Sequence, residues 1–191
     1  SPTRKTCLLV EFAVAVTGTI TITGSLDSSP VSETLSISSS TFKNSIKMYD
    51  SITSIALDAT IHTNNREIDA EKFFRGMFET CLKSTEVIEA IEFKIPQKSS
   101  YQKLPNPASR YAIIGVYVAK HKTGINVGVT GAKSCVYNDK DLAGALTKNF
   151  SSSAIDSVKI SSSGMNSDIH ASSDYRANMV KAFAKKAVDA C

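Results

Sequence analysis

The chain has 191 residues, of which 42% are hydrophobic and 21% are charged, and these fractions exclude a wholly disordered, collagen-like or disulfide-scaffold protein. Its 22 Lys and Arg residues against 18 Asp and Glu residues give a net charge of +4. Because the basic residues are spread along the chain, nucleic acid is not an expected partner, and we predict a soluble globular protein.

The longest apolar stretch, Cys7–Val16, is interrupted by Glu11. It is about half the length of the ~20 residues that a membrane-spanning helix needs, so no membrane span is expected. The four cysteines are far apart and form no CxxC pair, which predicts neither a zinc site nor a disulfide framework. A reducing, cytoplasmic location fits this cysteine usage best.

Residues 1–54 are rich in Ser and Thr and show no helical period. Thr17–Gly24 alternates with period two, and Glu33–Ser38 does so with a thinner apolar face. These patterns predict strands and loops that bury little apolar surface by themselves.

The pattern changes at Ile55. Ala56–Thr63 is typical of a strand, Asn64 and Asn65 suit a tight turn, and Arg66–Ile68 is the expected return strand. The sequence therefore predicts a β-hairpin at the start of this region.

A short helix is expected over Ala70–Arg75, with Asp69 as its N-cap and Gly76 at its end. Ala90–Ile95 then alternates apolar and polar residues up to Pro96, which predicts a half-buried strand. Gln97–Ser109 contains two prolines and no periodicity, so that we expect a connector or a functional loop there.

Tyr111–Ala119, Ile125–Thr130 and Lys133–Tyr137 are β-rich runs with short turns between them. They predict a three-stranded antiparallel meander. Helices are expected over Asp139–Asn149 and Ala154–Ile160.

The last predicted helix begins after an N-cap at Ser172 or Ser173. Its expected apolar face consists of residues at helical spacing, namely Tyr175, Met179, Ala182, Phe183 and Ala187. Strands followed by helices predict an α+β fold with helices on one face of a small sheet.

Asp168, His170 and Ser172 contain an acid, a base and a nucleophile within five positions. A catalytic triad normally joins distant segments of the chain, so these residues are expected to cap and anchor the last helix. His62 and His121 have no second ligand at metal-binding spacing and are expected to be strand and turn residues. No catalytic residue and no metal ligand is predicted.

Three motifs taken together resemble the FAD-binding medium subunit of the carbon monoxide dehydrogenase and xanthine dehydrogenase type of molybdenum hydroxylase. They are Ala56–His62, Asp69–Thr80 and Tyr101–Tyr111. The ending Asn166–Val180 is similar to the close of that family's C-terminal domain. The resemblance extends from Ile55 to Cys191.

The resemblance implies an electron-transfer subunit that holds FAD, receives electrons from an iron-sulfur small subunit and assembles with a molybdopterin large subunit. It implies that residues 55–98 are the remnant of the second FAD-binding subdomain and that residues 99–191 are the C-terminal domain. Residues 1–54 have no clear match in the family. By resemblance, Ile88 would lie against the flavin and Lys103 near the cofactor, where a cation stabilises the reduced flavin or the phosphates.

The family's two glycine loops, which cradle the FAD diphosphate through backbone N–H groups, are missing or scrambled. Gly18–Ile20 and Gly24–Leu26 are at most an echo of the second loop. The chain is therefore expected to be an incomplete medium subunit, an oxidoreductase subunit that is inactive in isolation. The alternative is a non-catalytic assembly or binding module that docks partner subunits. A core role for Ile88 and a solvated role for Lys103 also stay open.

Overall fold

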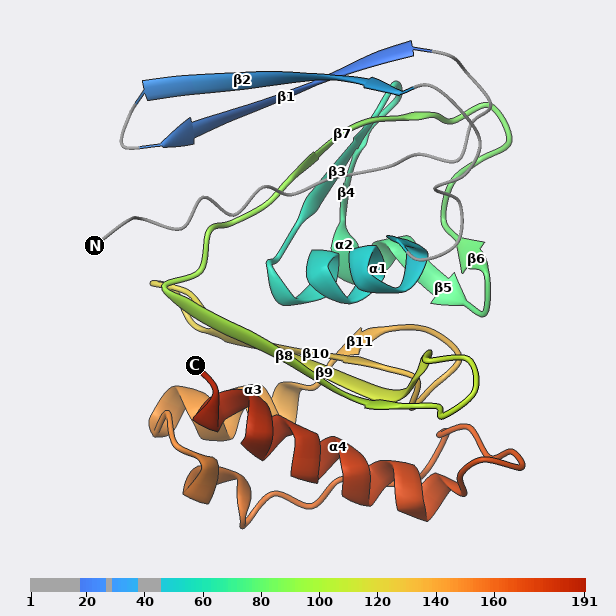
Figure 1. The fold of residues 1–191 in the computed structure, drawn as a ribbon, viewed down its shortest axis with the longest axis vertical. Coiled ribbons are helices and arrows are strands. Elements are labelled where there is room, and N and C mark those ends of the chain that lie inside the picture. The colour runs from blue at the N-terminus through green and yellow to red at the C-terminus, as the bar shows by residue number, and fades with distance from the viewer. Residues whose placement is uncertain (1–17, 27–28, 38–45) are drawn as a thin grey trace. The chain divides into compact units, whose positions relative to one another are not determined.

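The computed structural model describes residues 18–26, 29–37 and 46–191, and it divides the chain into two compact units, residues 1–47 and 48–191. In the first unit, β1 (Gly18–Leu26) and β2 (Ser29–Ile37) form an antiparallel hairpin in which Gly18 lies opposite Ile37 (Figure 1). The period-two alternation predicted both strands. The apolar stretch Cys7–Val16 lies outside the described residues.

The second unit is a mixed α and β structure with antiparallel sheets. Its first half contains α1 (Ile46–Ala56), β3 (Thr60–Thr63), β4 (Glu67–Asp69), α2 (Ala70–Phe73), β5 (Phe74–Gly76), β6 (Glu79–Thr80) and β7 (Ile88–Glu92). Its second half contains β8 (Lys98–Pro105), β9 (Ala112–Lys120), β10 (Ile125–Thr130), β11 (Tyr137–Asn138), α3 (Lys140–Lys148), the 3-10 helix η2 (Ser152–Ile155) and α4 (Ser173–Asp189). No helix in the described ranges is both long and apolar enough to cross a membrane.

The C-terminal sheet has the order β11-β10-β9-β8 and is four-stranded, which corrects the predicted three-stranded sheet. The additional strand is β8, which lies within the segment expected to be a connector and pairs with β9 over its whole length. As an edge strand it has one neighbouring strand, and several of its residues, such as Ser100 and Gln102, are polar and half-buried. No apolar alternation therefore marked it in the sequence.

Both faces of this sheet are covered (Figure 1). Ile114, Val116 and Val118 of β9 pack into the core that α3 and α4 complete. The alternate residues Tyr117 and Ala119 face the opposite side, where they meet residues of α1. The alternation along one strand thus explains why two layers sandwich the sheet.

Helix α4 begins as predicted, because the Ser172 hydroxyl accepts a hydrogen bond from the Tyr175 backbone N–H. Phe183 and Ala187 are buried as expected. Tyr175 is 44% exposed, so its assignment to the core was wrong. The buried stripe instead includes Arg176, because a charged residue that has buried partners can take a core position.

The predicted hairpin between residues 56 and 68 is formed by β3 and β4, in which Ile61 lies opposite Ile68. The strand starts later than expected, since Ala56 is the last residue of α1 and is completely buried. The β7 strand pairs with the other edge of β3 and completes a sheet of order β4-β3-β7.

Two short helices are shorter than predicted. Helix α2 ends at Phe73, and Phe74–Gly76 form β5 instead. Asp69 precedes α2 without a side-chain cap, because its carboxylate pairs with Lys72 at 2.6 Å. The helix expected over residues 154–160 is the single 3-10 turn η2.

Candidate functional site

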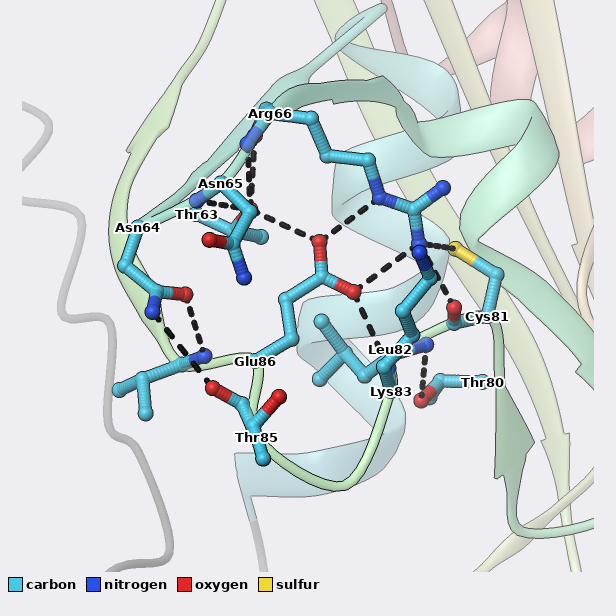
Figure 2. Close-up of polar contacts among 11 residues, drawn as sticks. Thr63, Asn64, Asn65, Arg66, Thr80, Cys81, Leu82, Lys83, Thr85 and Glu86 are labelled. Carbon is cyan, nitrogen blue, oxygen red and sulfur yellow. Dashed lines mark hydrogen bonds and ion pairs between the residues drawn. The ribbon is translucent and has the colours of Figure 1, made fainter.

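An ion pair between the buried Glu86 side chain and the exposed Arg66 holds the loop that leads to Ile88 (Figure 2). The Glu86 side chain has no exposed surface, and its Oε1 accepts hydrogen bonds from Arg66 Nε at 2.7 Å and Thr63 Oγ1 at 2.9 Å. Its Oε2 accepts from Arg66 Nη2 and from the Lys83 backbone N–H, each at 3.0 Å. The Arg66 hydrogen bond, followed by that from Lys83, lowers the pKa of Glu86 to about 2.

This ion pair connects the turn of the β3–β4 hairpin to residues 81–87. Arg66 Nη2 also donates to the Cys81 carbonyl at 2.8 Å. The Val87 backbone N–H donates to Asn64 Oδ1 at 3.0 Å, so that the two segments are fastened at both ends (Figure 2). We refer to this network as the Arg66–Glu86 clamp. It fixes the position at which β7 begins, and Ile88 is the first residue of that strand.

Ile88 is half-buried and packs against the apolar cluster that includes Ile61 and Phe73. In the sheet it lies opposite Thr63, a member of the clamp. These contacts give Ile88 a packing role, and its contact with a flavin stays a prediction.

Lys103 lies on β8, opposite Gly115 of β9, and is half-buried. Its Nζ donates to the carbonyl of Arg110 at 3.2 Å, so the side chain reaches the β8–β9 turn. Tyr101, two residues earlier and therefore on the same side of the strand, packs against the cluster that also receives Ile88. Ile88 and Lys103 thus belong to two different sheets, and their joint approach to a cofactor stays a prediction.

The residues that echo a phosphate loop do not fit the FAD diphosphate. Gly18–Leu26 is paired with β2 from end to end as an extended strand. Successive N–H groups of a strand point to opposite sides, whereas a diphosphate cradle needs N–H groups that converge. The described part of the first unit therefore supplies no such cradle.

A cleft of about 450 Å³ lies at the end of the C-terminal sheet where the β8–β9 turn meets the start of α4. Arg176 lines it and is only 4% exposed. Its Nη1 donates to the carbonyls of Ile113 at 2.8 Å and Gly131 at 2.9 Å, and its Nη2 pairs with Asp168 at 2.6 Å. The side chain thus ties α4 to the neighbouring ends of β9 and β10.

The structure confirms the expected capping role of residues 168–172. Asp168 Oδ1 accepts hydrogen bonds from the backbone N–H groups of His170 at 2.9 Å and Ala171 at 3.0 Å. The pKa of Asp168 is lowered, most strongly by the hydrogen bond from His170 and further by those from Ala171 and Arg176. The carboxylate therefore orders this turn and anchors α4 through Arg176.

The other two histidines are a strand residue and a turn residue, as predicted. His62 lies on β3 between Glu67, at 3.4 Å, and Glu92, at 3.5 Å. His121 follows β9 and its Nε2 lies 3.0 Å from the Ala56 carbonyl. Within the described ranges, no three His, Cys, Asp or Glu side chains are grouped so that they could hold a metal ion.

Sequence patterns did not reveal the clamp or the role of Arg176. Arg66 and Glu86 are 20 residues apart and sit in a turn and a loop without periodicity. Arg176 did give a signal, since it stands at the helical spacing of the buried residues Val180, Phe183 and Ala187. Because charged residues are seldom fully buried, this spacing did not lead to a core assignment for Arg176.

Neither a protein-family model nor a curated protein matches the chain. Solved structures do share its fold, each at 18% sequence identity and over 73% of this chain. They include reconstituted CO dehydrogenase from Oligotropha carboxidovorans (TM-score 0.62), quinoline 2-oxidoreductase from Pseudomonas putida 86 (0.60) and the cyanide-inactivated form of the Cu,Mo-CO dehydrogenase (0.61). This chain covers 54%, 54% and 55% of those chains, which is about half of their length.

Proposed function

We propose that the chain is an FAD-type electron-transfer subunit of a molybdenum hydroxylase, with an incomplete cofactor site of its own. The observation that carries this proposal is the shared fold, at a TM-score of 0.62 over 73% of the chain, with CO dehydrogenase. The motifs between Ile55 and Cys191 support the same family independently. An iron-sulfur subunit and a molybdopterin subunit are the proposed partners, and the cytoplasm is the proposed location.

In this proposal residues 55–98 correspond to the end of the second FAD subdomain and residues 99–191 to the C-terminal domain. Ile88, positioned by the Arg66–Glu86 clamp, would offer an apolar contact to the flavin ring. Lys103 would offer a cation, which favours a negatively charged cofactor. The diphosphate half of FAD has no fitting cradle in the described residues, so the isolated chain is proposed to be inactive.

An assembly or binding module is the second candidate. The pairing of Gly18–Leu26 as a strand favours it, because a strand in place of a phosphate loop offers the diphosphate of a cofactor no converging N–H groups. In that case the second unit would serve only to dock partner subunits.

Two measurements on the purified chain test both candidates. The first is the visible absorbance of a desalted sample, which reports bound flavin. The second is co-purification with an iron-sulfur subunit and a molybdopterin subunit that are expressed together with the chain. We expect little flavin and stable association with a partner subunit. Failure to associate with either subunit would contradict both candidates, whereas stoichiometric FAD in the isolated chain would contradict the incomplete cofactor site.

A further inference from the structure

The tip of the β5–β6 hairpin carries two exposed apolar side chains. Phe78 is 100% exposed and Met77 is 64% exposed. Phe78 also has a φ of 59°, in the left-handed region that bulky side chains avoid. A strained backbone that presents a fully exposed aromatic ring is unfavourable for a lone molecule, and such strain is concentrated at functional positions.

A receptor of suitable size lies beside this tip, since Met77 also lines the cleft of about 450 Å³. The rim of the cleft contains a second exposed aromatic side chain, Tyr111, at 51% exposure. The cleft is also lined by Arg176, whose Nε is buried and has no hydrogen-bond partner in the described structure. The lining also includes the apolar side chains of Ala112 and Ile113, so an inserted phenylalanine ring packs against apolar surface there.

The charges beside the tip are self-complementary. Arg75 on β5 and Glu79 on β6 are both exposed and flank Met77 and Phe78. Neither forms an ion pair within the described part of the chain. A twofold contact between two such hairpins offers opposite charges on both copies, so that Arg75 of one can pair with Glu79 of the other.

We propose that this surface binds a second copy of the chain, with Phe78 of each copy inserted in the cleft of the other. A twofold interface uses one patch on both molecules, which requires the knob and its receptor to lie close together on the same surface. The structure meets that requirement, because Met77 belongs to the hairpin tip and also lines the cleft. This dimer does not depend on flavin, so its failure would leave the proposed function untouched.

Sedimentation equilibrium of the full chain over a range of concentrations tests the proposal. We expect a reversible dimer, and Phe78→Ser should raise its Kd by about 30-fold or more, as expected for a central aromatic anchor. Ile95→Ser is the matched control, because Ile95 is 80% exposed and follows β7, outside the hairpin and the cleft lining. It should change the Kd by less than about twofold, within the effect of an ordinary surface substitution.

A charge swap tests the twofold geometry separately. Arg75→Glu and Glu79→Arg should each weaken the dimer, and the double variant should recover it, because the pair is then restored in reverse order. Circular dichroism verifies that each variant is folded. A wild-type chain that remains monomeric at about 100 µM would overturn the proposal. Equal Kd values for Phe78→Ser and Ile95→Ser, or a loss of partner-subunit binding in Phe78→Ser with an unchanged dimer, would overturn it as well.

Discussion

Replacing Arg176 with Met tests whether one buried cation fastens α4 to the C-terminal sheet. Methionine keeps the unbranched stem in the core but removes the donors to the carbonyls of Ile113 and Gly131 and the ion pair with Asp168. A hydrogen bond to a charged group contributes about 1.5–3 kcal/mol, so losing two should lower the free energy of unfolding by about 3 kcal/mol or more. For a chain of this size that corresponds to a melting temperature lower by about 6–12 °C.

Lys181→Met is a matched control on the same helix. Lys181 Nζ also donates to two carbonyls, those of Asp156 at 2.7 Å and Val158 at 2.8 Å, but it does so nearer the solvent. Water can replace these bonds, and we expect a loss below about 1 kcal/mol. Urea unfolding of the two variants and the wild type gives the comparison. An Arg176→Met variant that loses no more stability than Lys181→Met would refute the reasoning.

Three further predictions concern the clamp, a turn and the proposed cofactor contact. The folded-state pKa of Glu86 is lowered from the ordinary 4.5 to about 2. The ionised carboxylate therefore stabilises the fold above pH 4.5, and this stabilisation is lost as the pH falls toward 2. Glu86→Gln should flatten the dependence of the urea midpoint on pH between these two values. Gly131→Ala should lower the free energy of unfolding by more than about 2 kcal/mol, because φ is 81° and the new Cβ would lie 2.3 Å from the Ile113 carbonyl oxygen. Gly144 lies within α3 with open space around it, so Gly144→Ala should raise the free energy of unfolding by about 0.5–1 kcal/mol in the same assay. In a flavin-containing complex, Lys103→Ala should slow flavin reduction or weaken FAD retention while the unfolding midpoint stays unchanged, and equal flavin content and reduction rates would remove Lys103 from the site.

The strongest local patterns in the sequence predicted the elements that they mark. Helix α4 has an N-cap at Ser172 and apolar residues at helical spacing, and both signals are local. Helix α3 has a similar cap, since Asp139 accepts a hydrogen bond from the Leu142 backbone N–H. Paired asparagines likewise mark the β3–β4 hairpin turn. In each case the residues that define the element are neighbours in the sequence.

The missed features depend on contacts between distant residues. The β8 strand exists because β9 offers it a complete ladder, while its own residues are polar and its end contains Pro105. Helix α1 forms although residues 46–54 were expected to be strand and loop and Ala56 was expected to begin a strand, because Ile52 and Ala56 pack closely over Gly128 of β10. Tertiary packing overrides local preference in such cases.

The candidate site could be predicted only in part. Asp168 and Ser172 act on neighbouring backbone groups, so their capping roles followed from sequence spacing. The Arg66–Glu86 clamp joins a turn to a loop 20 residues later, and no sequence pattern specifies that pairing. The exposure of Phe78 likewise results from the fold, since its sequence neighbours Phe73 and Phe74 lie in the core or against it.

The flavin content of a grafted chain tests the central claim most directly. In this graft, a complete upstream FAD region from a flavoprotein of the same fold replaces residues 1–45, so that α1 and its buried Ile52 are kept, and the chain is expressed together with iron-sulfur and molybdopterin subunits. The account predicts about one FAD per grafted chain, retained after desalting, and little FAD in the unmodified chain under the same conditions, because convergent backbone N–H groups are what hold a diphosphate. A grafted, folded chain that binds neither flavin nor a partner subunit would contradict the account.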